Sequence, residues 1–455
     1  MNARKANYAK EKARELQRTL YLAAKEKPSR RFHALYDKIC REDIMTYAWK
    51  KVKANKGSAG IDRVTIQSIV MDYGEGRFIK ETCGQLRNGT YRPSPVKRVD
   101  IPKGDGRTRP LGIPIVRDRL VQMAAKIVLE GIFEADFKDF SYGFRPKRSA
   151  HDALRKIMDT TNYGKVYWVV DVDIKGYFDN IPHEKLMKLI EQRVCDRKVL
   201  KLIRGWLTAG VMKDDQFHES VIGSPQGGVI SPLLANIYLN YLDTIWERQF
   251  AHLGTLVRYA DDLVVLCHRR AEAHESIRVL KAVFARLELT MNVEKSKLVN
   301  IWDDDQGFDF LGHHLRRLPV LRKGGKHSRI LRCFPSRKAM KKMRTTVKEV
   351  TAPRHVLRKQ LSELVKELNP KIRGWRNYYA KVDKGAANGF LSKIDWYIRG
   401  RLMIFCRKKF KRWKISYLSG VLKQAKLRSV TTWRVRTAQG EERRKAVCGK
   451  TARTV

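Results

Sequence analysis

The chain has 455 residues, 43% of them hydrophobic, and its 95 Lys and Arg against 47 Asp and Glu give a formal net charge of +48. This apolar content excludes global disorder, and no run approaches the roughly 18 consecutive apolar residues of a membrane span. A chain this basic is expected to bind a polyanion, and its length suggests about three domains at roughly 150 residues each.

The N-terminus and the cysteines indicate a cellular compartment. The first twenty residues lack the apolar core of a signal peptide, so the chain is expected to be soluble and intracellular. The cysteines lie at least 42 residues apart, at Cys40, Cys83, Cys195, Cys267, Cys333, Cys406 and Cys448. That spacing forms no CxxC pair for a zinc ribbon or redox site, and it predicts free thiols in a reducing compartment.

The positive charge is concentrated in the C-terminal third. Residues 313–455 carry 41 Lys and Arg against 7 Asp and Glu, a net charge of +34, whereas residues 1–312 carry 54 against 40, a net charge of +14. Such an excess repels itself unless a partner neutralises it. A phosphate backbone is the expected partner, because each neutralised phosphate releases condensed counterions.

Helical and strand patterns alternate in the first part of the chain. Residues 3–27, charged and rich in alanine, predict an exposed basic helix, and residues 31–56 predict a second helix. A β-branched run enters and leaves the glycine turn at 104–106, which predicts a β-hairpin. Helical periodicity returns at 117–139.

Short apolar strands follow. YWVVDVDI at 167–174 is typical of a buried strand, and two more apolar runs, 254–260 and 262–268, lie on either side of Asp261. A helix is expected at 270–288. This alternation of helices and short strands predicts an α+β body that extends to residue 312.

From about residue 336 the pattern is almost purely helical. Helical segments are expected at 336–350, at 355–369 and at 386–413, with Pro353 and Asn369-Pro370 separating them. They predict a small basic helical bundle appended to the α+β body. For the last forty residues, a short β element and a basic tail stay open as alternatives.

Carboxylates lie at the ends of the apolar strands. Asp171 and Asp173 are two residues apart and share a face if the strand continues through them, and Asp261 and Asp262 lie at the turn of the later hairpin. Carboxylates gathered at strand ends repel one another unless a cation lies between them. Oxygen ligands of this kind suit Mg²⁺, although a single such Asp is more often a turn or cap residue.

These residues carry a resemblance to a known family. YADD at 259–262 and DIKGYFDNIPH at 173–183 resemble the palm motifs of reverse transcriptases. IPKGDGRTRPLGIP, SYGFRPKRSAHDA, SPQGGVISPLLANIYLN, NVEKSK and FLGH follow in the order seen in group II intron reverse transcriptase-maturases, and KIRGWRNYYAKV at 371–382 resembles their maturase domain. The resemblance covers roughly residues 42–413.

The resemblance implies an α+β right-hand polymerase followed by an all-α maturase or thumb domain. The implied domains are a basic helical N-terminal extension at 1–40, the fingers and palm at 41–312, the helical maturase domain at 313–415, and a basic segment at 416–455 as a possible DNA-binding remnant. Many family members end in a Cys-rich HNH endonuclease, and the C-terminal sequence shows no such pattern of cysteines and histidines.

The family's catalytic roles carry over by motif position. Asp173 matches the first metal-binding aspartate, and Asp261 and Asp262 match the pair in YADD. The resemblance implies two Mg²⁺ ions, with Mn²⁺ as a possible substitute, that activate the primer 3′-hydroxyl and stabilise the departing pyrophosphate. No protein nucleophile is required.

Five further residues match positions near the incoming nucleotide. In the family, the position of Tyr177 holds a bulky side chain that excludes the 2′-hydroxyl of a ribonucleotide. The alternative is that Tyr177 is only an aromatic residue packed in the palm. Lys103 and Arg109 flank the glycine-rich hairpin and are expected to close on the triphosphate, unless the hairpin is only a solvated loop. Gln226 matches a glutamine beside the nucleotide, and Lys295 in NVEKSK is a weaker match.

The helical domain combines aromatic and basic residues at helical spacing. Its aromatic residues are interpreted mainly as bundle packing: Trp375, Tyr378, Tyr379 and Trp396. The interspersed basic residues are expected to face outward and to contact intron RNA or the template-primer backbone: Lys371, Arg373, Arg376 and Lys381.

The function implied is an RNA-directed DNA polymerase that binds group II intron RNA, assists its splicing and copies it into cDNA during intron mobility. The implied partners are intron RNA, an RNA template with its primer, a DNA target and deoxynucleoside triphosphates, in the bacterial cytoplasm and away from membranes. Two alternatives stay open: a splicing-only maturase, and a domesticated or CRISPR/defence-associated reverse transcriptase.

Overall fold

The structure is a computed structural model that describes residues 3–102, 108–213, 216–218, 222–224, 227–303, 306–321, 327–410, 427–429, 433–436 and 442–445. The predicted turn at 104–106, Lys103 and Gln226 lie outside these residues, as does most of 416–455. The chain forms two compact units. The first contains Met1–Arg148, Val172–Leu263 and His274–Ser296, and the second contains Ser149–Asp171, Val264–Ala273 and Lys297–Val455.

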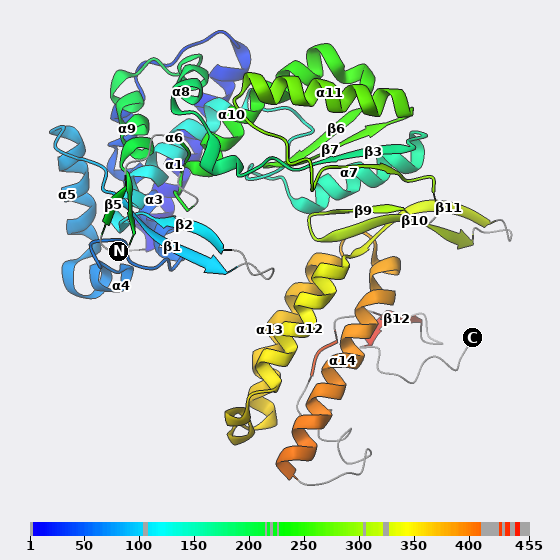
Figure 1. The fold of residues 1–455 in the computed structure, drawn as a ribbon. Helices are drawn as coiled ribbons and strands as arrows, with labels where there is room; N and C mark the ends of the chain where they lie inside the picture. The colour runs from blue at the N-terminus through cyan, green and yellow to red at the C-terminus, as the bar shows by residue number, and fades with distance from the viewer. Residues whose placement is uncertain are drawn as a thin grey trace. The chain divides into compact units, whose positions relative to one another are not determined.

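The first unit is mainly helical (Figure 1). Its helices are α1 (Ala3–Glu26), α2 (Tyr36–Ile39), α3 (Glu42–Ala54), α4 (Ile66–Ser68), α5 (Glu75–Arg87), α6 (Val116–Glu134), α8 (His183–Glu191), α9 (Arg197–Thr208) and α10 (Ser231–Ile245), with the short turns η1 (Ile69–Tyr73), η2 (Tyr177–Asn180), η3 (Trp246–Phe250) and η4 (Ala251–Leu253). The helix α11 (Arg270–Arg286) begins in the second unit and ends in the first. No described helix combines the length and hydropathy of a membrane span.

Helix α6 forms the centre of this unit. Apolar side chains occur all around it, which is typical of a fully buried helix, and Leu120, Ala124 and Val128 are completely buried. Helices α1 and α3 pack against α6. At Gly131 a Cβ atom would lie 2.6 Å from the carbonyl oxygen of Gln17, so glycine permits this close approach of α1.

The prediction that the N-terminal helix is exposed is wrong for one of its faces. Ala9, Ala13, Leu20 and Ala24 are buried and recur at helical spacing, whereas most of the charged residues of the helix are exposed. Small alanines on the buried stripe let the helix lie close to α6. The helix is therefore part of the core of the first unit and not a separate extension.

The predicted hairpin is confirmed. Strands β1 (Val96–Pro102) and β2 (Thr108–Ile113) pair antiparallel, from Lys97 opposite Ile113 to Pro102 opposite Thr108. With β4 (Val211–Lys213) and β5 (Gln216–His218) they form a sheet of order β2-β1-β4-β5. The β-branched run on either side of a glycine-rich turn was the signal for this hairpin.

The predicted apolar strands are also present. Strands β3 (Trp168–Val172), β6 (Thr255–Tyr259), β7 (Asp262–Cys267) and β8 (Lys297–Asn300) form a sheet of order β6-β7-β3-β8. The chain passes from the second unit to the first at the end of β3, and from the first to the second early in β7. Asp173 directly follows β3, and Asp261 lies between β6 and β7.

The second unit contains a three-stranded sheet where a helical domain was predicted. Strands β9 (Gly307–Phe310), β10 (His313–Leu321) and β11 (His327–Pro335) have the order β11-β10-β9. Burial alternates along the strands, with His313 and Leu315 buried in β10 and Leu331 and Cys333 buried in β11. The helices follow only from Arg337, as the helical pattern from about residue 336 predicts, so the segment 313–335 of the predicted maturase domain consists of strands where it is described.

The second unit also contains helices (Figure 1). They are α7 (Ala150–Tyr163), α12 (Arg337–Thr351), η5 (Arg354–Arg358), α13 (Leu361–Tyr379) and α14 (Lys384–Phe410). The predicted break at Pro370 is wrong, because α13 continues through it. Leu368 and Ile372, on either side of the proline, are buried in the same cluster as Leu391, and this packing offsets the hydrogen bond that proline removes.

The open question about the last forty residues is resolved for the described part. Strands β12 (Trp433–Arg436) and β13 (Glu442–Lys445) pair antiparallel, from Trp433 opposite Lys445 to Arg436 opposite Glu442. The β-element alternative is therefore correct for these eight residues, whose alternating TTWRVR pattern favours a strand.

The buried His313 gives the second unit a pH-dependent stability. Burial lowers its pKa to about 4 from 6.5, so the neutral imidazole stabilises the fold above pH 6.5, and this contribution is lost as the pH falls towards 4. We expect His313→Phe, which keeps a ring against Tyr378 and Tyr379, to remove roughly 2 kcal/mol of the stability loss between pH 7 and pH 5.

The measurement is the free energy of unfolding in urea at the two pH values. The matched control is His355→Gln, which changes an exposed histidine of the same unit and should leave the pH dependence unaltered. An identical pH dependence in wild type and His313→Phe would show that the buried imidazole does not carry this effect.

Candidate catalytic site

Asp173 is held by the segment that contains NVEKSK. Its carboxylate Oδ2 accepts a hydrogen bond from Asn292 Nδ2 at 3.0 Å and lies 3.3 Å from Lys295 Nζ. Its backbone N–H donates to Ser296 Oγ at 3.2 Å, and its carbonyl oxygen accepts from the Asn292 N–H at 2.8 Å. Lys295, the weakest of the sequence-based matches, therefore lies directly beside the first predicted catalytic aspartate. Asn292 and Ser296 were not predicted, although both belong to the quoted motif.

Asp261 and Asp262 belong to the same electrostatic environment as Asp173. Although the side chain of Asp262 keeps contact with solvent, the protein around it displaces part of its water, and this desolvation raises its pKa to about 6. Repulsion by Asp261 and Asp173 adds to the effect, and Lys295 opposes it. The pKa of Asp261 is likewise raised, first by burial and then by Asp173, against the attraction of Arg109 and Arg258.

The donor chemistry of these carboxylates fits a divalent cation. Three mutually repelling carboxylates are stabilised when a positive ion lies between them, and their oxygens are the ligands that Mg²⁺ prefers. Within the described parts of the chain, no three Asp, Glu, His or Cys side chains already form a metal cage. Mg²⁺ often binds through one or two carboxylates together with substrate phosphates and water, and the arrangement suits that mode.

Tyr177 is buried next to these carboxylates. The side chain lies in η2, its residue is only 2% exposed, and its hydroxyl donates to the carbonyl oxygen of Ala235 in α10 at 2.5 Å. Its ring packs edge-on against Phe178, with 5.4 Å between the ring centroids. These contacts support the alternative of a packed aromatic, and leave the predicted exclusion of ribonucleotides as a hypothesis to be tested.

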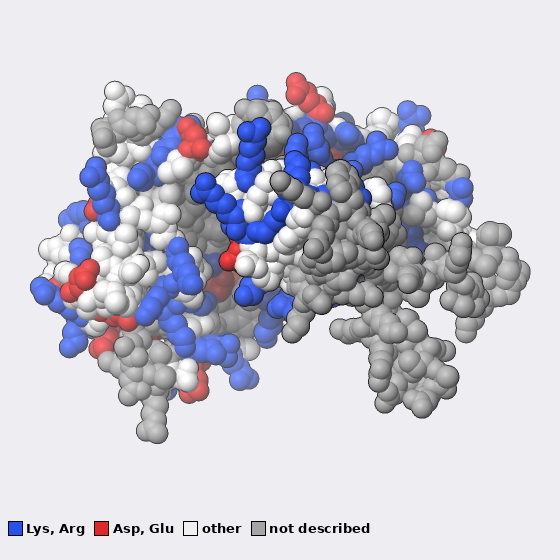
Figure 2. Space-filling model, turned by 90° about the horizontal axis from the view of Figure 1, so that it is seen from below, with Lys and Arg blue, Asp and Glu red and all other residues white. Residues whose placement is uncertain are grey.

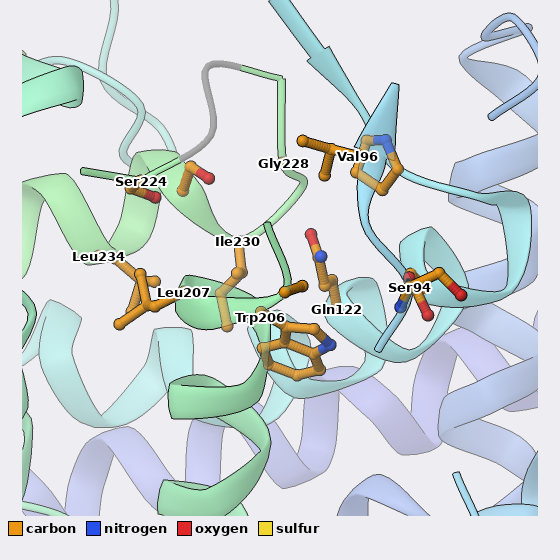
Figure 3. A pocket seen from close by; sticks show the side chains of 13 residues that line it. Ser94, Val96, Gln122, Trp206, Leu207, Ser224, Gly228, Ile230 and Leu234 are labelled. Atoms are coloured by element: carbon orange, nitrogen blue, oxygen red, sulfur yellow. The ribbon is translucent and has the colours of Figure 1, made fainter. Parts of the chain in front are cut away.

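The hairpin and the SPQGG loop approach each other in the first unit. Gly227 has φ +128°, and a Cβ atom there would lie 2.5 Å from the carbonyl oxygen of Gly112 in β2. The next turn of the loop is held by Gln122 of α6, whose Oε1 accepts from the Val229 N–H at 2.9 Å. Gln122 lines a small cavity together with Trp206 and Ile230 (Figure 3). Glycine at 227 thus permits the close approach of this loop to β2.

Arg109 is the one member of the predicted cation pair among the described residues. It lies on β2 with an exposed side chain, and its charge lowers the pKa of Asp261 against the effect of burial. Strand β2 therefore brings a cation into the electrostatic environment of the carboxylates.

The basic residues of the helical domain form a separate group in the second unit. Lys371, Arg373 and Lys381 are exposed, as predicted, whereas Arg376 is half-buried. On the face shown in Figure 2, Lys and Arg side chains are widespread and Asp and Glu are sparser. This group provides positive charge at the surface of the second unit.

The prediction that the aromatic stripe packs in the bundle is correct for two of its four residues. Trp375 and Tyr379 pack against the helical core. The Tyr378 ring instead contacts His313 of the β-sheet, with 5.1 Å between centroids. Trp396 is 78% exposed, so the prediction is wrong there. The buried stripe of α14 runs through Leu391, Ile394 and Ile398, and Trp396 falls outside it.

Comparisons with known proteins agree with these features. Residues 101–315 match the family described as reverse transcriptase (RNA-dependent DNA polymerase), and residues 340–425 match the group II intron, maturase-specific domain. Protein YkfC of Escherichia coli is 32% identical over 367 residues, which cover 71% of this chain and 93% of YkfC.

Two further relatives each match about half of this chain. The group II intron-encoded protein LtrA of Lactococcus lactis subsp. cremoris is 43% identical over 216 residues, 47% of this chain and 35% of LtrA. An uncharacterized 91 kDa protein in the cob intron of Schizosaccharomyces pombe is 37% identical over 227 residues, 49% of this chain and 27% of the relative. The chain thus spans about a third of the length of LtrA.

Proposed function

The chain belongs to the family of group II intron-encoded reverse transcriptases and maturases, and we propose that it is an RNA-directed DNA polymerase that copies intron RNA into cDNA during intron mobility and assists splicing of that RNA. The observation that carries the proposal is the electrostatic coupling of Asp173, Asp261 and Asp262 in the first unit. A chain that only bound RNA would gain nothing from holding three repelling carboxylates together, which disfavours the splicing-only alternative.

Each residue has a defined part in the proposed reaction. The three aspartates would hold two Mg²⁺ ions, and these ions, when bound, would supply activation of the primer 3′-hydroxyl and neutralisation of charge on the phosphates. Lys295 and Asn292 fix the Asp173 carboxylate through their contacts to its Oδ2. Arg109 is proposed to bind the triphosphate of the incoming deoxynucleotide, and Lys103 and Gln226 are assigned to the same nucleotide by motif position alone. No side chain has to act as a nucleophile.

The proposed partners follow from the charge of the chain. An RNA template with its primer, intron RNA and a DNA target all present phosphate backbones, which suit a chain of net charge +48. Lys371, Arg373, Arg376 and Lys381 are proposed to contact RNA through phosphates and shape, because RNA helices are recognised mainly by their shape and by phosphate and 2′-hydroxyl contacts.

Removing one carboxylate tests the catalytic assignment. We expect Asp261→Ala to lower the rate of DNA synthesis on an RNA template by roughly a thousandfold, because the substitution removes a metal ligand, and to leave the Kd for RNA within about twofold. Synthesis should also require Mg²⁺ or Mn²⁺ and stop in chelator.

The matched control is Asp37→Ala, which removes an exposed carboxylate from α2 and should leave the rate unchanged. Primer extension by Asp261→Ala at the wild-type rate would exclude Asp261 from the metal site.

The role of Tyr177 can be tested by comparing two substitutions. If its ring limits the space beside the incoming sugar, Tyr177→Ala should raise the use of ribonucleotides relative to deoxynucleotides by about tenfold, measured as a ratio of kcat/KM values. Tyr177→Phe keeps the ring and removes only the hydrogen bond to Ala235, so it should retain discrimination. Unchanged discrimination in Tyr177→Ala, combined with lower stability, would assign the residue to packing alone.

The salt dependence of RNA affinity tests the basic group on the second unit. Replacing Lys371, Arg373 and Arg376 with Gln should reduce the slope of log K against log salt concentration by roughly 0.7 to 0.9 for each phosphate that the variant no longer neutralises. The rate at saturating template should change less.

The matched control removes three exposed positive charges from the first unit, at Lys188, Arg197 and Lys201. An equal decrease in slope for both triple variants would show that the effect is one of net charge and that the second unit holds no particular RNA-binding surface.

A further inference from the structure

The turn that carries Asp261 and Asp262 has a strained backbone. Ala260 has φ +58°, in the left-handed region that residues with a Cβ atom adopt at a cost of about 1 to 2 kcal/mol. The SYGFRP segment presses on the same turn, since a Cβ atom on Gly143 would lie 2.3 Å from the Ala260 nitrogen. A conformation of this kind persists only where surrounding contacts determine it.

A buried guanidinium supplies such contacts. Arg258, completely buried on β6, donates from Nε and Nη2 to the two carboxylate oxygens of Asp243 in α10, at 2.8 and 2.5 Å. Its Nη1 donates to the carbonyl oxygen of Ala260 at 2.9 Å. The guanidinium of Arg258 thus binds helix α10 through Asp243 and binds the strained residue through the Ala260 carbonyl oxygen.

Asn236 connects the Arg258 guanidinium to the SYGFRP segment. Arg258 Nη1 also lies 3.2 Å from Asn236 Oδ1, and Asn236 Nδ2 donates to the Gly143 carbonyl oxygen at 2.7 Å. The backbone of Arg258 pairs with the same segment, since its N–H donates to the Phe140 carbonyl oxygen at 2.8 Å and its carbonyl oxygen accepts from the Tyr142 N–H at 2.8 Å. The turn and the SYGFRP segment that lies against it are therefore both connected to α10.

Stability alone does not explain this arrangement. Asp243 and Arg258 are both completely buried, and the desolvation of such a pair offsets much of its attraction, so that apolar residues of similar volume are often as stable or more stable. Apolar residues, however, cannot donate to the Ala260 carbonyl oxygen or to Asn236. What distinguishes the ion pair is the fixed direction of its hydrogen bonds.

We infer that Arg258, Asp243 and Asn236 are positioning residues, which hold the Ala260 turn in its left-handed conformation and thereby set the places of the Asp261 and Asp262 carboxylates. The inference rests on the proposed polymerase function for its consequence in catalysis. Arg258 reaches Asp261 through space and the backbone, and it is assigned no contact with substrate.

The test compares Arg258→Lys with a matched control in the same unit. Lysine keeps the positive charge but lacks the planar guanidinium, which donates to Asp243 and to the Ala260 carbonyl oxygen at the same time. The control is Arg193→Lys, at another buried arginine that pairs with one carboxylate, Asp136, and donates to backbone carbonyl oxygens, including that of Ala24. A third variant, Asp243→Leu with Arg258→Met, replaces the ion pair with apolar side chains. Because an apolar pair is expected to keep the fold stable, this variant separates the loss of the hydrogen bonds from unfolding.

Two readouts are used on the full chain, well below the unfolding temperature of each variant. Hydrogen exchange of the peptide that contains residues 259–262 reports on the turn without requiring activity. Steady-state DNA synthesis reports kcat and the KM for deoxynucleotide. We expect Arg258→Lys and the apolar pair to speed exchange in this peptide by about tenfold and to lower kcat by about tenfold, with KM within about threefold. Arg193→Lys should change neither.

The readouts separate failure of this inference from failure of the proposed function. Unchanged exchange in the 259–262 peptide of Arg258→Lys would overturn the positioning role, and so would an apolar pair that restores both stability and kcat. If the wild-type chain makes no DNA, the proposed function fails, while faster exchange in Arg258→Lys still supports the positioning of the turn.

Discussion

The mutual repulsion of three carboxylates is the constraint on which the site depends. Asp173 raises the pKa values of Asp261 and Asp262, and Asp261 also raises that of Asp262. Partial burial strengthens the effect because less water screens the charges. Left alone, such groups would move apart or take up protons. The structure instead holds them: Lys295 and Asn292 bind Asp173, while the turn of Asp261 and Asp262 is fixed by contacts of its own backbone.

The local elements that present these groups could be predicted from the sequence. The apolar runs that form β3, β6 and β7 are short and have Asp at or next to one end, so periodicity and composition are enough to place the carboxylates at strand ends. The β1 and β2 hairpin was predicted from β-branched residues around a glycine turn. Choosing Asp173 over Asp171 required the resemblance to a family. Residues two apart in a strand point to the same face, so strand geometry alone does not distinguish the two aspartates.

Features decided by tertiary contacts could not be predicted in this way. The burial of α1 depends on the glycine of α6 opposite Gln17, and the continuation of α13 through Pro370 depends on the partners of Leu368 and Ile372. Trp396 looked like a packing residue by spacing, yet the buried stripe of α14 excludes it. The pairing of Arg258 with Asp243, fifteen residues apart, leaves no periodic signal at all.

The site therefore combines a motif that can be recognised in the sequence with supporting contacts that cannot be predicted from it. Motif residues place charge at the strand ends, whereas buried polar side chains from α10 fix the geometry of those charges. This division explains why the candidate catalytic residues were found from sequence and their supports were not. Polar groups completely buried near a site of perturbed pKa values are the places where such supports should be sought.

Direct measurement of bound cation tests the central claim that the three carboxylates form one divalent-cation site. Electron paramagnetic resonance of Mn²⁺ can count the ions bound to the full chain with an RNA template, a DNA primer and a non-incorporable deoxynucleotide analogue. We predict about two bound ions in the wild type and a loss of this binding in both Asp173→Asn and Asp261→Asn. Equal Mn²⁺ binding by the wild type and these two variants would contradict the shared site.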